Sequence, residues 1–157
     1  MASVGYAIRQ AVKTLLVNAA ISGIDTANIK TRMMTKATKG IDTLPCVIIS
    51  PYGTISDKPA DFEGSRDRSF RVRIALIDAT GGDAQTNDEI YSSWIEEAVD
   101  AILVDSGGIW QGFCRETLTT VPRVWQIRAD IINTFDDALL EEGLYAFQNA
   151  VIRFDWQ

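Results

Sequence analysis

The stretch "FRVRIALIDA", residues 70–79, decides how the rest of the chain is interpreted. Every second position from 70 to 76 holds a large apolar side chain: Phe70, Val72, Ile74 and Leu76. Because successive side chains of a β-strand point to opposite faces, this period predicts a strand that is buried on one face. Arg71 and Arg73 then share the opposite face.

Four arginines fall within eight positions at the start of this stretch: Arg66, Arg68, Arg71 and Arg73. Guanidinium groups match phosphate oxygens, so a nucleic-acid contact is one interpretation. The other is a strand face that is solvated or meets the acids of a neighbouring subunit. We favour the second, because no aromatic platform accompanies the arginines as single-strand binders require. Arg66 and Arg68 lie nearer the preceding loop and need not share the face of Arg71 and Arg73.

Two segments have the three- and four-residue apolar spacing of an amphipathic helix. The first covers residues 4–19, and Gly23 is placed to end it. The second covers residues 90–103 and is preceded by a capping box from Thr86 to Glu89.

Four further segments have the β-branched and aromatic content of strands: residues 28–34, 46–50, 115–130 and 144–156. Pro122 should bend the third of them or confine it to a sheet edge. Loops are expected at 35–43 and 52–67, where Gly, Pro, Ser, Thr and Asp are frequent. The order α, β, β, β, α, β, β predicts an α+β fold: a two-layer sandwich whose mainly antiparallel sheet of about five strands carries both helices on one face.

The composition is that of a soluble globular protein, and residues 1–157 are expected to form a single domain. No apolar run approaches the roughly 20 residues that cross a bilayer, and no signal peptide is evident, so we expect a cytoplasmic chain that does not enter a membrane. The net charge of −6 argues against a protein that coats nucleic acid. Residues 1–40 carry +5 and the remainder −11, which is either chance clustering or a polarity suited to head-to-tail contacts between subunits.

None of the chemical signatures in the chain predicts an enzyme or a cofactor. Gly81 and Gly82 precede a helix as in a phosphate-binding loop, but neighbouring carboxylates would repel a phosphate and no Gly-Lys-Ser/Thr ending follows. The chain has no histidine, so neither Cys46 nor Cys114 has an imidazole base, and both thiols are expected to be reduced. Four acids could in principle form an oxygen-rich metal site, but solvated acids in a turn are the expected outcome: Asp136, Asp137, Glu141 and Glu142.

Taken in order, the N-terminal helix, "LPCVIISPYG", the long loop, "FRVRIALIDATGG", the helix "NDEIYSSWIEEAVDAIL" and the closing strand in "LEEGLYAFQNAVIRFDW" resemble the tail terminator proteins of long-tailed bacteriophages. The resemblance spans nearly the whole chain and consists of patterns of apolar residues. It implies a structural virion subunit that forms a ring, expected to be a hexamer, at the head-proximal end of the tail tube. Such a ring stops tube polymerisation and provides the head–tail joining surface.

The partners that the resemblance implies are further copies of the chain, the tail tube protein and a head–tail connector or neck protein. Assembly would take place in the host cytoplasm, and DNA would pass through the ring without sequence-specific binding. The arginine strand would then face a neighbouring subunit or the lumen, and the loops at 35–43 and 52–67 would be arms. Two alternatives stay open: another phage neck or tail-completion subunit, and a small metal-dependent hydrolase that uses the acids at 136–142.

Overall fold

The computed structural model describes residues 3–33, 43–59, 66–79, 88–103, 121, 123–133 and 145–157. The predicted α+β class is confirmed within these residues. In chain order the elements are α1 (Val4–Ala19), the 3₁₀ turn η1 (Thr26–Asn28), β1 (Ile29–Thr31), β2 (Cys46–Pro51), β3 (Ser56–Pro59), β4 (Arg66–Ala79), α2 (Asp88–Leu103), β5 (Val124–Asn133) and β6 (Tyr145–Trp156).

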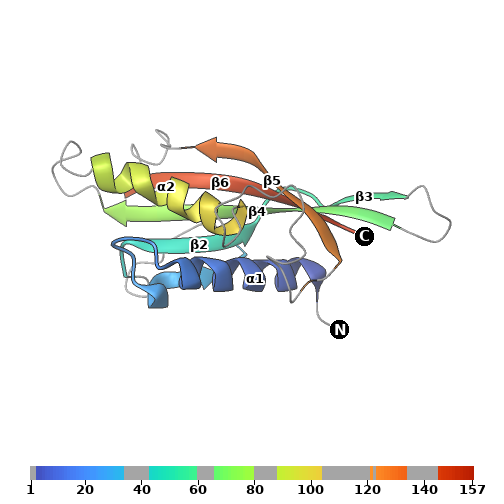
Figure 1. The fold of residues 1–157 in the computed structure, drawn as a ribbon, viewed down its shortest axis with the longest axis horizontal. Coiled ribbons are helices and arrows are strands. Elements are labelled where there is room, and N and C mark those ends of the chain that lie inside the picture. Colours follow the sequence, from blue (N-terminus) through green and yellow to red (C-terminus); the bar gives the residue numbers. More distant parts are fainter. Residues whose placement is uncertain are drawn as a thin grey trace.

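The strands form one sheet with β4 at its centre (Figure 1). The strand order is β1-β2-β4-β6-β5, and β3 pairs with β4 beside this path. At the midpoint of β4, Ile74 lies opposite Ile49 of β2 on one side and Ala150 of β6 on the other. Every pairing except that of β1 with β2 is antiparallel, which confirms the mainly antiparallel sheet.

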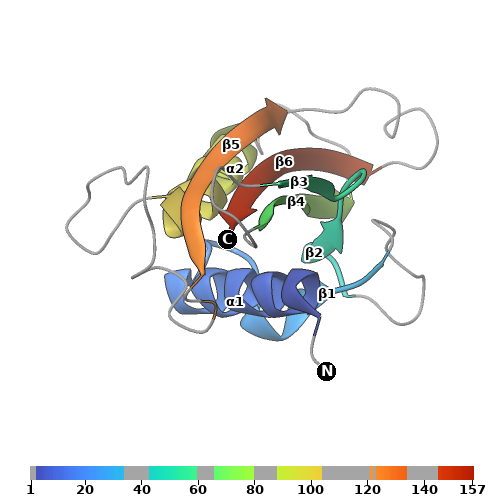
Figure 2. The same ribbon diagram turned by 90° about the vertical axis from the view of Figure 1, so that its right-hand side faces the viewer.

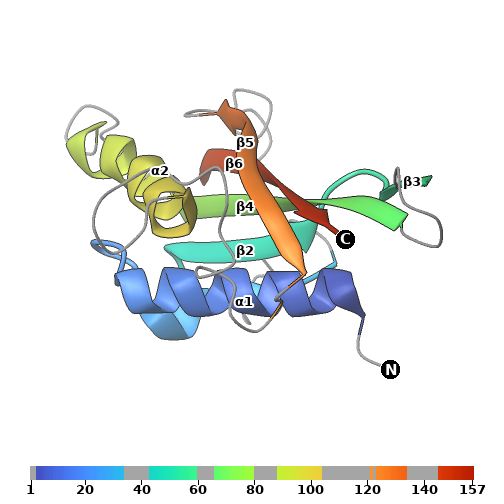
Figure 3. The ribbon, with the colours of Figure 1, turned by 45° about the vertical axis from the view of Figure 1, so that its right-hand side comes forward.

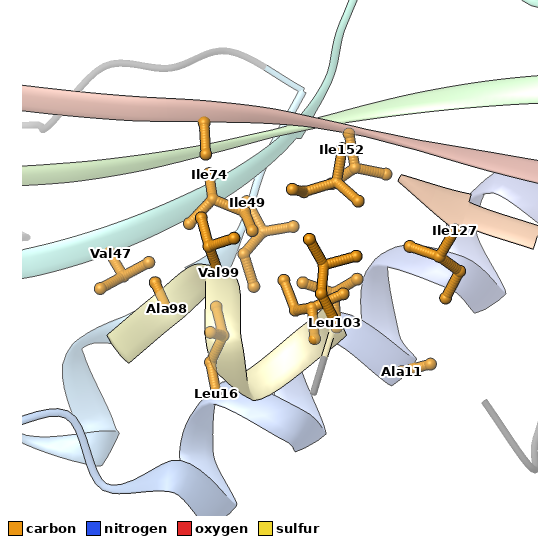
Figure 4. Packing of buried hydrophobic residues seen from close by; sticks show 14 of the residues in the cluster. Ala11, Leu16, Val47, Ile49, Ile74, Ala98, Val99, Leu103, Ile127 and Ile152 are labelled. Atoms are coloured by element: carbon orange, nitrogen blue, oxygen red, sulfur yellow. The ribbon is translucent and has the colours of Figure 1, made fainter. Parts of the chain in front are cut away.

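Both helices cover the same face of this sheet, as predicted (Figure 1). Neighbouring strands send Ile49, Ile74 and Ile152 into one cluster with Leu16 of α1 and Val99 of α2 (Figure 4). The alternation inside β4 explains this: Phe70, Val72, Ile74 and Leu76 are all buried in the cluster. The opposite face of β4 carries Arg71 and Arg73 and, further along, Ala75 and Ile77.

The first helix has the predicted bounds, but Gly23 is not the residue that closes it. Ser3 caps its start by accepting a hydrogen bond from the backbone N–H of Tyr6. At the other end Ala20, not Gly23, takes the left-handed conformation that closes the helix, with φ of 50°. Burial of Ile21 immediately after the cap explains the choice, because an apolar residue at this place anchors the turn to the core. Gly23, with φ of 81°, serves the following turn.

The turn after α1 is bonded directly to α2. Trp94 donates its indole N–H to the carbonyl of Ser22 at 2.7 Å. Glu97 accepts from both the backbone N–H and the hydroxyl of Ser22, at 2.9 and 3.2 Å. These three bonds fix how the two helices lie across the sheet. Thr86 of the predicted capping box lies outside the described residues, and α2 begins at Asp88.

The first two strands are the exception in this mainly antiparallel sheet. The strand predicted over 28–34 is only β1, and it runs parallel to β2, with Ile29 opposite Val47. A parallel pair requires a crossover of about a dozen residues, and the segment 32–45 is long enough to provide one. The predicted loop at 35–43 lies, apart from Thr43, outside the described residues.

The long loop expected at 52–67 is also wrong in part, because it contains β3 and the first residues of β4. Ser56 to Pro59 pair with Ser69 to Arg66 on the same edge of β4 that β2 occupies further along. Gly53, with φ of 64°, lies where the chain passes from β2 to β3. The segment "SDKP" shows no apolar alternation, so the period that identified β4 could not reveal β3.

The strand predicted over 115–130 is β5, which begins at Val124 and forms the end of the strand order opposite β1. Its pairing with β6 shifts register twice, between Val124 and Gln126 and between Ala129 and Ile131. Such irregularities bend a strand and increase its twist. In Figures 2 and 3 β5 curves so that its first residues lie next to α1. Pro122 lies outside the described residues.

We predict that Ile74→Ala lowers the free energy of unfolding by about 2 to 5 kcal/mol, because the substitution leaves a cavity at the centre of the core. Ile74 is fully buried, whereas Ile132 at the sheet edge is 50% exposed. The matched control Ile132→Ala should change the free energy by less than about 0.5 kcal/mol. Urea unfolding of both variants measures this, and equal losses would contradict the position assigned to β4.

Candidate functional site

Charged side chains from three strands meet on the face of the sheet that α1 and α2 leave uncovered. The register places Arg71 of β4 opposite Arg153 of β6, and Arg153 opposite Arg128 of β5. On the same face, two residues further along each strand, Ser69 lies opposite Asp155. Three arginines therefore lie side by side across the strands, and cationic side chains in this arrangement repel one another unless carboxylates lie between them.

Asp155 is the carboxylate at the centre of this cluster, and it is only 4% exposed. The hydroxyl of Ser69 donates to its Oδ1 at 2.6 Å, and Nε of Arg153 donates to the same oxygen at 2.9 Å. Nη2 of Arg128 lies 3.6 Å from Oδ2. Burial of a charged carboxylate is costly without such partners, so the bonds both stabilise Asp155 and hold the two guanidinium groups in place.

Arg71 has a carboxylate partner within its own chain. Its Nε lies 3.0 Å from Oδ2 of Asp130, which β5 presents at its second register shift. The two side chains are 45% and 25% exposed, so the pair contributes at most about 1 kcal/mol to stability. Asp130 therefore orients Arg71 at little energetic gain and leaves it accessible to solvent.

A polar pocket of about 440 Å³ opens beside this cluster, where β3 meets the ends of β5 and β6. We call it the arginine pocket, because Arg68, Arg71, Arg128 and Arg153 line it together with Asp67 and Asp155. Among the described lining residues the cations outnumber the anions by four to two. The pocket therefore favours an anionic group, and guanidinium forks suit carboxylates and phosphates.

The structure separates the four arginines singled out in the sequence. Arg71 and Arg73 share the face opposite Phe70 and Val72, as the alternation predicted. Arg68 alternates with Arg71 along β4, but its guanidinium, 5.8 Å from the centre of the Trp156 ring, also lines the arginine pocket at the end of the sheet. The first residue of β4, Arg66, pairs with Pro59, and its side chain lies outside the described residues.

The charged partners on β5 and β6 were not identified from the sequence. The closing strand carries a signal for two of them, because Ala150, Ile152 and Phe154 alternate with Val151, Arg153 and Asp155. The same period places Arg128 of β5 on the face of the sheet that Ile127 does not occupy. What the sequence could not supply is the pairing of β6 with both β4 and β5, which brings these residues to Arg71.

Other candidate chemistry falls mostly outside the described residues: Gly81, Gly82, Cys114, Asp136, Asp137, Glu141 and Glu142. Within the described part of the chain, no three His, Cys, Asp or Glu residues are grouped so that they could hold a metal ion. Cys46 is buried beside Ile48 and Ala75 on the face away from the helices and packs there as a small apolar residue. Neither α1 nor α2 is long and apolar enough to span a bilayer.

Comparison with models of protein families gives no match for this chain, and a search of curated proteins gives none either.

We predict that Asp155→Asn lowers the free energy of unfolding by about 1 to 3 kcal/mol, because two guanidinium groups lose a buried carboxylate acceptor. The control Asp130→Asn removes a partly exposed acid and should cost less than about 1 kcal/mol. Denaturant unfolding at neutral pH compares the two. If Asp130→Asn lowered the free energy of unfolding more than Asp155→Asn does, Asp155 would not be the central carboxylate of the cluster.

Proposed function

We propose that this protein is a structural subunit that binds copies of itself to form a ring at the head-proximal end of a bacteriophage tail tube. In this role it ends tube polymerisation and presents the surface that joins the head. The tube protein and a connector or neck protein are its other partners, and DNA passes through the ring. The chain acts in the virion, by contact alone, after assembly in the host cytoplasm.

The first support for this proposal is the order of elements. The segments on which the resemblance to tail terminators rests are α1, β2, β4, α2 and β6 of one α+β unit. In the structure these segments supply both helices and the three central strands of the sheet. The apolar patterns behind the resemblance are thus the patterns that build the core.

The observation that carries the proposal is the arm formed by β3 with residues Arg66–Ser69 of β4. Figures 1 and 3 show this arm projecting beyond α1 and β5. Within the described residues, β4 pairs at Arg66 and Asp67 with β3 alone, and β6 joins only from Arg68. A two-stranded ribbon is marginally stable in water, so an arm of this kind gains most from a surface supplied by a neighbour.

An exposed apolar side chain marks the base of the arm. Ile55 directly precedes β3 and is 60% exposed. Large apolar side chains next to charged groups are typical of surfaces that bind other proteins, because an apolar centre surrounded by polar residues excludes water. The arm and the arginine pocket together offer both kinds of contact at one end of the sheet.

We predict that the purified chain forms particles several times heavier than 17.3 kDa, with a ring of six copies as the expected form. Light scattering over a range of concentrations gives the mass, and negative-stain microscopy shows the shape. Ile55→Asp should raise the concentration needed for half-assembly about tenfold, since burying a charge at the arm costs over 1 kcal/mol.

The control is Met33→Asp, which alters another exposed apolar side chain just after β1; Met33 is 73% exposed and Ile55 60%. It should leave assembly unchanged. A chain that stays at 17.3 kDa at every concentration contradicts the proposal. If Ile55→Asp and Met33→Asp impaired assembly equally, the arm would have no specific role in the contact between copies.

A further inference from the structure

We infer that the arginine pocket of one copy binds the exposed carboxylates of Glu96 and Asp100 on α2 of a second copy. The inference rests on the proposed function, because it names the contact through which the copies bind one another. It commits to a protein carboxylate as the occupant of the pocket, and phosphates of nucleic acid become an alternative outcome of the test.

Among the contacts between described residues, Arg71, Arg128 and Arg153 use only part of their hydrogen-bond donors on the aspartates of the site. A guanidinium carries five N–H donors. Arg71 and Arg153 each use Nε to contact an aspartate, and Arg128 uses Nη2. Arg128 is 48% exposed although Asp155 holds it, so it combines a fixed position with access to a partner. Preorganised cations of this kind bind an anion with little loss of side-chain entropy.

The second half of the contact is the outer face of α2. Glu96 and Asp100 are exposed and four residues apart, which places their side chains next to each other on the helix surface. Ile95 and Val99 point the other way, into the core. Glu97 is excluded from the contact because it is bonded to Ser22.

This acidic pair has no basic neighbour to neutralise it within α2. The helix sequence "DEIYSSWIEEAVDAIL" contains no lysine or arginine. Like charges four residues apart on a helix repel each other, so a cationic partner relieves a repulsion that no residue of α2 itself offsets. The chain as a whole carries −6, which makes a pocket with excess positive charge the complementary surface for another copy.

The positions of the two surfaces allow a closed assembly. The arginine pocket lies at the arm end of the sheet, and α2 extends toward the opposite end of the molecule (Figures 1 and 3). Because one copy presents different patches to its two neighbours, the contact is heterologous, and repetition of a heterologous contact gives a ring or a filament. A ring is what the proposed function requires.

The test exchanges the charges of the two surfaces. Arg128→Glu removes the excess positive charge of the pocket, leaving three arginines and three acids, and the double variant Glu96→Lys with Asp100→Lys reverses the charge of the helix face. Each should raise the concentration for half-assembly at least about tenfold, as loss of a close interfacial charge pair does. A chain that carries all three substitutions should recover part of the assembly lost in the double helix variant, because the introduced lysines then meet a pocket that has three acids for its three remaining arginines.

Two additional variants keep the test decisive. Arg128→Gln removes the positive charge without placing a second carboxylate beside Asp155, so it serves if Arg128→Glu fails to fold. Lys13→Glu makes the same change of sign as Arg128→Glu but on α1, and it should leave assembly unaffected. Circular dichroism confirms the fold of every variant, and sedimentation at two salt concentrations measures assembly, which should weaken as salt rises.

The outcomes separate the inference from the proposed function. If the unaltered chain assembles and both surface reversals assemble equally well, the inference is overturned and the ring proposal stands. If the pocket variant loses binding to a DNA oligonucleotide while assembly persists, the occupant is a phosphate and the inference is again wrong. If Lys13→Glu alone disrupts assembly, the basic N-terminal region makes the contact instead. If the unaltered chain does not assemble at any concentration, both the proposed function and this inference are contradicted.

Discussion

The rest of the structure depends on β4 having one apolar face, buried under the helices, and one face that carries charged residues. Alternate residues of this strand must lie in the core under α1 and α2, so the residues between them are forced to the other face. The strand is also held on both edges, by β2 and β3 on one side and by β6 on the other. A shift of one residue would bury Arg71 under the helices, which no pairing in the core could offset.

That constraint also explains why charged residues gather at one end of the sheet. The face away from the helices is apolar where β2 and β4 carry Cys46, Ile48 and Ala75, and it becomes charged toward Arg71. The neighbouring antiparallel strands must then place compatible side chains beside these charges. On β6, for example, Asp155 accepts a hydrogen bond from the Ser69 hydroxyl. The arginine pocket is thus a product of strand pairing. Its members are distant in sequence and are brought together only by the order β4-β6-β5.

The parts that could be predicted are those whose signal lies within one element. The apolar alternation of residues 70–76 and the helical spacing in 4–19 and 90–103 each identify a buried face without reference to any other segment. The layer architecture follows from them, and the structure confirms it.

The parts that could not be predicted depend on contacts between elements. The polar strand β3 exists because β4 offers it an edge, and its own residues show no apolar period. The parallel direction of β1 is set by its pairing with β2, and nothing in residues 28–34 indicates that direction. For the candidate site, the faces of Arg71 and Arg73 were predictable, whereas the partners Asp130 and Asp155 were not, since each depends on register across strands.

The central claim is that the protein works by binding a different surface of another copy of itself. The most direct measurement is a cryo-electron microscopy map of the assembled particle at a resolution that shows side chains. The account predicts that every copy places its sheet end, with β3 and the arginine pocket, against α2 of the next copy around a closed ring. A particle in which copies meet through identical patches about a twofold axis, or in which this end of the sheet touches no other copy, would contradict it.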